Sequence, residues 1–149
     1  MSERIQVTLG AGCFWGAEAG FRAMPGVLDT RVGYARGEQH ELPGVEVVQV
    51  DFDPSVVSLS AVIENFWTLH DPTSVDRQGP YSGAKYRSVI FVTSAQQEEE
   101  ANAAKRALSE SGRFAAPVVT EIALLEHFEP ASEEDQRYVE KHGAGACSL

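Results

Sequence analysis

Apolar and polar positions alternate in several short runs of the chain, which is the period of a β-strand with one buried face. Ile5, Val7 and Leu9 alternate with polar residues and predict the first strand. Further runs rich in β-branched residues predict strands over residues 27–34, 45–52, 86–93 and 118–124. Between residues 72 and 85 lies a long loop with two prolines and two glycines, and loops of this length are usually functional.

Helical spacing and capping residues predict four helices between and after these strands. Phe14, Ala17 and Phe21 recur at helical spacing directly after Cys13. Serines that suit N-caps open the other three, which run over about 58–70, 94–110 and 132–141. The order βαββαβ followed by αβα predicts an α+β fold. We expect a two-layer sandwich with a ferredoxin-like βαββαβ core, a mostly antiparallel sheet and a C-terminal extension.

Composition narrows the class of protein. The chain has 149 residues, of which 43% are hydrophobic and 23% charged, and we expect one domain over residues 1–149 with a flexible tail at 143–149. The formal net charge of −10 argues against nucleic acid or an anionic membrane as partner. The chain shows neither an export segment nor a membrane-spanning run, so we expect a cytoplasmic protein. We also predict that it is a monomer. The four histidines have no metal-ligand spacing with the cysteines, and we predict no metal and no cofactor.

Cys13 is the first candidate for chemistry, because it stands where the first strand meets the first helix. Unpaired backbone N–H groups and the helix dipole favour a thiolate there, which lowers the pKa of the cysteine and makes it a nucleophile. The small residues of Gly10-Ala11-Gly12 allow a close approach to the sulfur. The alternative is an inert buried cysteine, since free cysteine is often buried.

Glu46 and Cys147 are two further candidates for chemistry on physical grounds. Glu46 has the same parity as Val48, Val50 and Phe52, so it begins the row that faces the core, where desolvation would raise its pKa toward the range of a general acid. The alternative is a frayed strand end with Glu46 in water. Cys147 lies in a tail of small residues that is flexible enough to reach Cys13, or else it is an exposed thiol without a role.

The motif Gly12-Cys13-Phe14-Trp15-Gly16 resembles the signature of the A-type peptide methionine sulfoxide reductases, whose cysteine attacks the sulfoxide sulfur of oxidised methionine. Other segments resemble the same family in the same order, and together they cover nearly the whole chain. They are Val32-Gly33-Tyr34-Ala35, Glu46-Val47-Val48-Gln49-Val50, Phe66-Trp67, His70-Asp71-Pro72-Thr73 and the stretch from Arg77-Gln78-Gly79 to Tyr86-Arg87-Ser88.

The resemblance implies a role for each candidate residue. Cys13 matches the family's nucleophile, Glu46 its acid, Cys147 the resolving cysteine, and Tyr86 a tyrosine that hydrogen-bonds the oxidised substrate. Phe14 and Trp15 match the pocket that holds the substrate's S-methyl group, although two core aromatics are the alternative. Tyr34, in the second motif, is assigned to the substrate-binding residues with them.

The sequence also departs from the family. The connection from Gly37 to Val45 is too short for the loop that usually carries an active-site tyrosine, so we expect a shortened active-site loop. Where the family has Asn-Asp after Gln-Gly, this chain has Pro80-Tyr81, and the aspartate that contacts substrate is missing. We therefore predict that Tyr81 replaces the lost tyrosine, the alternative being an exposed loop tyrosine.

The resemblance implies thiol-dependent reduction of methionine (S)-sulfoxide, free or in proteins, as in the repair of oxidised proteins. Cys13 would pass through a sulfenic acid, and Cys147 would condense with it to a disulfide that a thioredoxin-like partner reduces. One alternative is a non-catalytic binding module with the same fold, which the lost tyrosine and aspartate favour and the two cysteines and Glu46 disfavour. The other is a general thiol peroxidase.

Overall fold

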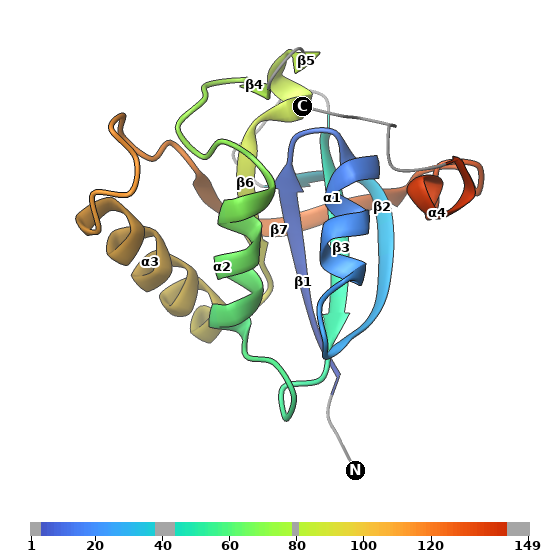
Figure 1. Ribbon diagram of the computed structural model, residues 1–149, viewed down its shortest axis with the longest axis horizontal. Coiled ribbons are helices and arrows are strands. Elements are labelled where there is room, and N and C mark those ends of the chain that lie inside the picture. Colours follow the sequence, from blue (N-terminus) through green and yellow to red (C-terminus); the bar gives the residue numbers. More distant parts are fainter. Residues whose placement is uncertain (1–3, 38–43, 79–80, 143–149) are drawn as a thin grey trace.

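The computed structural model describes residues 4–37, 44–78 and 81–142, and its first half follows the predicted order of elements (Figure 1). Strand β1 (Ile5–Ala11) leads into helix α1 (Phe14–Arg22), and the strands β2 (Val27–Gly37) and β3 (Val45–Phe52) follow. Helix α2 (Leu59–Leu69) begins after Ser58, whose hydroxyl accepts a hydrogen bond from the N–H of Ala61 at 3.0 Å. The serine N-cap predicted from sequence is therefore confirmed.

The second half begins with the long predicted loop, which contains a small hairpin. Its elements are β4 (Arg77–Gln78), β5 (Tyr81–Ser82) and the 3₁₀ helix η1 (Ala84–Tyr86), followed by β6 (Ser88–Val92). Helix α3 (Ala95–Glu110) begins after Ser94, whose hydroxyl accepts from the N–H of Gln97 at 3.1 Å. The chain continues with β7 (Glu121–Pro130) and α4 (Tyr138–His142).

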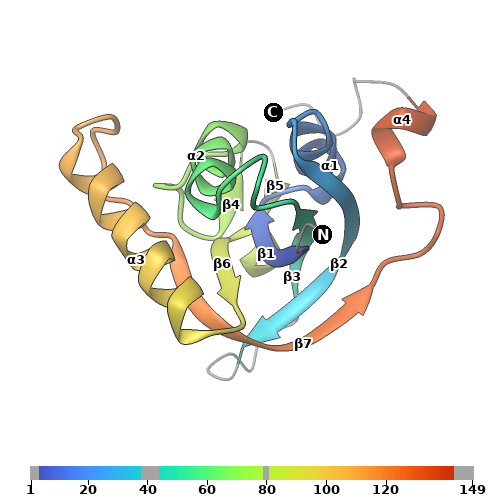
Figure 2. The same ribbon diagram turned by 90° about the horizontal axis from the view of Figure 1, so that it is seen from below.

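Five strands form a closed sheet in the order β1-β3-β2-β7-β6, in which β6 also pairs with β1. All pairs are antiparallel except β6 with β7, which are parallel and are joined by α3. Figure 2 shows β7 passing beneath the other strands from the α3 side toward α4. The fold is α+β as predicted, but its mixed sheet closes on itself, whereas the prediction was a two-layer sandwich with a ferredoxin-like βαββαβ core.

Closure depends on β7, which is longer at its C-terminal end than the predicted strand over 118–124. Residues 125–130 pair with β2, from Gly37 opposite Leu125 to Gly33 opposite Pro130. A side chain at Gly33 would collide with the carbonyl oxygen of Glu129, so glycine permits this close approach of the two backbones. Pairing between distant segments leaves little mark on local periodicity, which is why the sequence did not predict it.

Both faces of the sheet are buried, but the larger core lies under the helices. Figure 2 shows α1 and α2 on one side of the strands, with β7 on the other. Val48, Val50 and Phe52 of β3 belong to this core, while Val45 and Val47 belong to a smaller cluster on the opposite face. The alternation of β3 therefore places Glu46 on the helix-covered face, as its parity predicts.

The last predicted helix forms only in part. Residues 133–137 make turns instead of a helix that starts at Ser132, and α4 covers five residues. Arg137 explains the interruption because its φ of 52° lies in the left-handed region, which breaks a right-handed helix. Among the described residues, no helix has the length and apolar character needed to cross a membrane.

Candidate active site

Cys13 occupies the N-cap of α1, as the sequence predicts. Its backbone is extended (φ −60°, ψ 121°), and its carbonyl accepts the first helical hydrogen bond, from the N–H of Ala17 at 3.4 Å. The side chain caps no backbone N–H of the helix and is half-buried. The sulfur therefore stands at the positive end of the helix dipole, which favours a negative charge.

The turn before Cys13 owes its shape to Gly12, whose φ is +85°. A Cβ on Gly12 would lie 2.7 Å from Cγ of Gln78, so any side chain would strain both the backbone and this contact. Gln78 is fully buried and exchanges two hydrogen bonds with the backbone of Asp71, at 2.8 and 2.7 Å. Gly12, which was predicted together with Gly10 and Ala11 to let a ligand approach the sulfur, packs against Gln78.

Glu46, on β3, lines the same cavity as Cys13 and is 6% exposed. Its Oε1 accepts a hydrogen bond from the N–H of Phe14 at 3.3 Å, and its Oε2 lies 3.6 Å from Nζ of Lys85. Burial raises the pKa of Glu46, although the Phe14 N–H, Lys85 and a hydrogen bond with Tyr86 oppose the rise. The carboxyl group is therefore buried and more easily protonated than an ordinary glutamate.

Two tyrosines line the same cavity. Tyr34 on β2 stands directly opposite Glu46 on β3, so both side chains lie on one face of the sheet. Burial, followed by the negative charges of Glu46 and Asp135, raises the pKa of Tyr34, which keeps its hydroxyl protonated. Tyr86 ends η1 instead of starting a strand, because the N–H groups of Tyr86 and Arg87 close turns on Gly83 and Ala84.

Phe14 and Trp15 form an aromatic wall beside the sulfur. Phe14 is buried and its ring lies 5.6 Å from that of Tyr34, while Trp15 is half-buried with its ring 6.5 Å from Phe14. These rings, Cys13, Glu46 and the two tyrosines line one cavity of about 240 Å³. The structure thus brings together Cys13, Glu46, Tyr86, Phe14, Trp15 and Tyr34 from the predicted set.

Two cavity residues were not predicted from the sequence, Lys85 and Asp135. Lys85 places its ammonium 5.0 Å from the centre of the Tyr86 ring, and hydrogen bonding with Tyr86, together with Glu46, raises the pKa of Lys85. Its position next to Tyr86 in the sequence could have identified Lys85 as a cavity residue. Asp135 comes from the segment after β7 and had no local signal, because only the tertiary fold brings it to Trp15.

Two predicted residues cannot be placed in the cavity. Cys147 lies outside the described residues, as does most of the connection from Gly37 to Val45, so the shortened loop stays a prediction. Tyr81 belongs to β5, where its backbone pairs with Gln78, but its side chain lies outside the described part. The roles assigned to Cys147 and Tyr81 therefore remain predictions.

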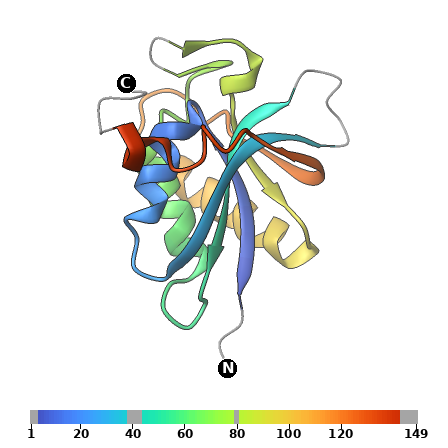
Figure 3. The same ribbon diagram turned by 90° about the vertical axis from the view of Figure 1, so that its right-hand side faces the viewer.

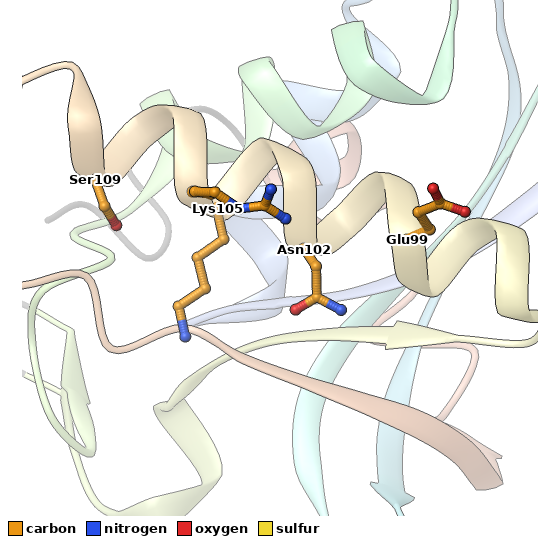
Figure 4. Close-up of a pocket in the computed structure, with 5 residues that line it drawn as sticks. Glu99, Asn102, Lys105 and Ser109 are labelled. Atoms are coloured by element: carbon orange, nitrogen blue, oxygen red, sulfur yellow. The ribbon is translucent and has the colours of Figure 1, made fainter.

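A larger hollow of about 600 Å³ lies along the outer face of α3 (Figure 4). Its lining is polar and mostly exposed, and consists of Glu99, Asn102, Lys105, Arg106 and Ser109. These five residues include neither a thiol nor a buried carboxyl group, whereas the lining of the smaller cavity at Cys13 includes both. The smaller cavity is accordingly the candidate active site.

Comparison with known proteins agrees with this geometry. The family model described as peptide methionine sulfoxide reductase matches residues 5–149. Peptide methionine sulfoxide reductase MsrA of Methanoculleus marisnigri is 47% identical, over 95% of this chain and 93% of that protein. The crystal structure of reduced Mxr1 from Saccharomyces cerevisiae is similar, with a TM-score of 0.85 and 30% identity over 94% of this chain and 86% of that one.

Mxr1 has also been crystallised in complex with Trx2, and that structure resembles this chain with a TM-score of 0.69. The two are 28% identical over 91% of this chain and 85% of that one. The family model and the relatives both extend over nearly the full sequence, including the cysteine, the acid and the aromatic wall of the cavity. The chain therefore belongs to the peptide methionine sulfoxide reductase family.

Proposed function

We propose that this protein reduces methionine (S)-sulfoxide, free or in proteins, to methionine. The observation that carries the proposal is the cavity itself, where Cys13 at a helix N-terminus faces a buried carboxyl group beside an apolar wall. A sulfoxide needs these three features, because its sulfur must be attacked, its oxygen must be protonated and its methyl group must be held. Family membership supports the same reaction.

In the first step, the thiolate of Cys13 attacks the sulfoxide sulfur while Glu46 delivers a proton to the oxygen. The S–O bond breaks as the protonated oxygen is transferred to the sulfur of Cys13, and the transient bond between the two sulfur atoms also breaks. Methionine then leaves, and Cys13 is left as a sulfenic acid. Burial supports this role of Glu46, because its raised pKa increases the protonated fraction near neutral pH. Tyr34 and Tyr86 line the same cavity and supply hydroxyl groups to the oxygen.

In the second step, the thiol of Cys147 condenses with the sulfenic acid, water leaves, and a disulfide joins the two cysteines. A dithiol donor of the thioredoxin type then reduces the disulfide by exchange and is itself oxidised. The complex of the structurally similar Mxr1 with Trx2 supports a partner of this kind.

The proposal is tested by supplying dithiothreitol and the separate S and R epimers of methionine sulfoxide, both free and in a peptide. We expect turnover of one epimer alone, because the cavity is chiral and the acid and nucleophile occupy fixed positions, and the family resemblance indicates the S epimer. Binding of the S epimer without turnover would instead identify a binding module. Reduction of hydrogen peroxide with neither epimer reduced would identify a thiol peroxidase.

Cys147→Ser should separate the two steps. We expect the variant to release about one methionine per enzyme in a single turnover and then to stall with thioredoxin, because nothing condenses with the sulfenic acid on Cys13. Trapping with dimedone and mass spectrometry would detect that sulfenic acid. Steady thioredoxin-driven turnover by the variant would show that Cys147 does not resolve the intermediate.

Tyr81→Phe tests whether Tyr81 replaces the tyrosine that the family usually has in its loop. A hydrogen bond to a developing charge contributes about 1.5–3 kcal/mol, so we expect kcat/KM for the sulfoxide to fall by roughly 10–100-fold. Reduction of the disulfide by thioredoxin should be unchanged, which provides an internal control. Tyr34→Phe is the matched variant inside the described cavity, and a loss there with wild-type activity in Tyr81→Phe would assign the role to Tyr34.

A further inference from the structure

Trp15, which walls the cavity, is held from two directions by residues of one distant segment. The indole Nε1–H donates a hydrogen bond to Oδ1 of Asp135 at 3.1 Å. The ring of Tyr138 stacks on the indole at a centroid distance of 3.8 Å and an interplanar angle of 10°. An edge contact and a face contact together fix both the tilt and the rotation of the indole ring.

The carboxylate of Asp135 is itself oriented by a second hydrogen bond. The hydroxyl of Ser132 donates to Oδ2 of Asp135 at 3.1 Å, which leaves Oδ1 directed at the indole. Asp135 lines the cavity beside Trp15 and is half-buried. The acceptor that fixes Trp15 thus has a defined direction.

The segment that carries Asp135 is anchored to the body of the protein independently of Trp15. Gln136 is 7% exposed and exchanges two hydrogen bonds with the backbone of Val32, at 2.9 and 3.0 Å. The N–H of Arg137 donates to Oε1 of Glu18, a carboxylate of α1 that is 1% exposed, at 2.6 Å. This bond holds Arg137 in its left-handed conformation and sets the start of α4.

A salt bridge completes the attachment. Nε of Arg22, in the last turn of α1, lies 2.9 Å from Oε1 of Glu140 in α4. Figure 3 shows α4 lying beside α1. The segment that carries Asp135 is therefore attached to α1 through Arg137 and Glu140. These attachments place Asp135 and Tyr138 against the indole of Trp15.

We propose that Asp135 and Tyr138 are positioning residues that fix the indole of Trp15, and thereby set the shape of the cavity that receives the S-methyl group. The inference rests on the proposed reduction of methionine sulfoxide, because it assigns Trp15 to the substrate. Asp135 acts through its hydrogen-bond acceptor, and its negative charge is not required. Tyr138 acts through its ring, and its hydroxyl is not required.

The experiment compares paired variants, each with one member that keeps the proposed contact. Asp135→Ala removes the acceptor, whereas Asp135→Asn keeps an oxygen at the same place and loses only the charge. Tyr138→Leu removes the aromatic face, whereas Tyr138→Phe keeps it. Glu133→Ala serves as the control for loss of an exposed carboxylate in the same segment.

The kinetic readout is reduction of S-epimer methionine sulfoxide with dithiothreitol. We expect Asp135→Ala and Tyr138→Leu to raise KM by about 10-fold with kcat changed far less, since the loss of a hydrogen bond or a stack weakens substrate binding before and during the reaction alike. Asp135→Asn, Tyr138→Phe and Glu133→Ala should each stay within about 2-fold of wild type.

The second readout does not need activity. Trp67, the other tryptophan, is 2% exposed, so acrylamide quenching of fluorescence reports mainly on half-buried Trp15, as Trp15→Phe would verify. Quenching should increase in Asp135→Ala and Tyr138→Leu and match wild type in the conservative variants. Equal impairment of Asp135→Asn and Asp135→Ala, or wild-type quenching in Asp135→Ala, would overturn the proposal. Absence of sulfoxide reduction by wild type would overturn the proposed function alone, because the quenching experiment tests the position of the Trp15 indole without any activity.

Discussion

Cys13→Ser should abolish reduction of methionine sulfoxide altogether, in single-turnover as well as steady-state assays. A serine hydroxyl stays protonated at neutral pH, so it cannot replace a thiolate as the nucleophile, and it cannot form a sulfenic acid. Methionine release followed by chromatography, with thioredoxin or dithiothreitol as donor, measures the effect. Residual release at about a tenth of the wild-type rate or more would show that another group attacks the sulfoxide.

The fold of this variant should not suffer, which makes the loss of activity interpretable. Cys13 is the N-cap of α1 and its side chain caps no backbone N–H. Serine is a preferred N-cap residue, and a good cap contributes about 0.5–2 kcal/mol. We therefore expect the thermal midpoint of Cys13→Ser, measured under reducing conditions, to equal or exceed that of the wild type.

Glu46→Gln should reduce the rate of the first step by about 10²-fold or more, because the amide keeps the shape of the side chain but has no proton to deliver. The new amide retains an oxygen that can accept from the N–H of Phe14, so the cavity should keep its geometry. The wild-type rate should decline as Glu46 deprotonates, at a pH above the usual range because its pKa is raised by burial. This decline of the rate at higher pH should be absent in Glu46→Gln.

The same substitution should stabilise the protein at neutral pH. A carboxyl group whose pKa is raised on folding favours the folded state most when the pH is below its unfolded pKa, and this contribution is lost as pH rises through the folded pKa. Glutamine is never ionised and avoids that loss. Thermal unfolding should show Glu46→Gln to be more stable than wild type at pH 7, with the difference shrinking toward about pH 4.

In the kinetic test, an unchanged single-turnover rate of Glu46→Gln across this pH range would assign the proton to Tyr86 or to water.

Local patterns carried most of the information that the sequence yielded. The caps at Ser58 and Ser94 were predicted because a capping residue and the amide it binds lie three positions apart. Alternation along the strand placed Glu46 in the row that faces the core, with a frayed strand end as the alternative, and the family resemblance favoured the inward orientation that the structure has. The helix N-terminus at Cys13 was predicted from a change of period at one residue.

Features set by contacts between distant segments were missed. Closure of the sheet depends on β7 pairing with both β2 and β6, and nothing within residues 121–130 specifies two partners. Asp135 reaches the cavity only because Gln136 and Arg137 are tied to Val32 and Glu18, which lie 104 and 119 positions earlier in the chain. The family resemblance pointed to Cys13 and Glu46 as candidate residues, but it gave no indication that Asp135 lines the same cavity.

The closed sheet limits how an oxidised polypeptide, the proposed substrate, can bind to this protein. Each strand of the ring has a neighbour on both sides, so this closed sheet, in the described part of the chain, has no edge strand that is open along its whole length. An open strand would pair with extended polypeptide segments through their backbones, whatever side chains these segments carried. We therefore expect an oxidised polypeptide to be held at the cavity and not by pairing along a whole free strand.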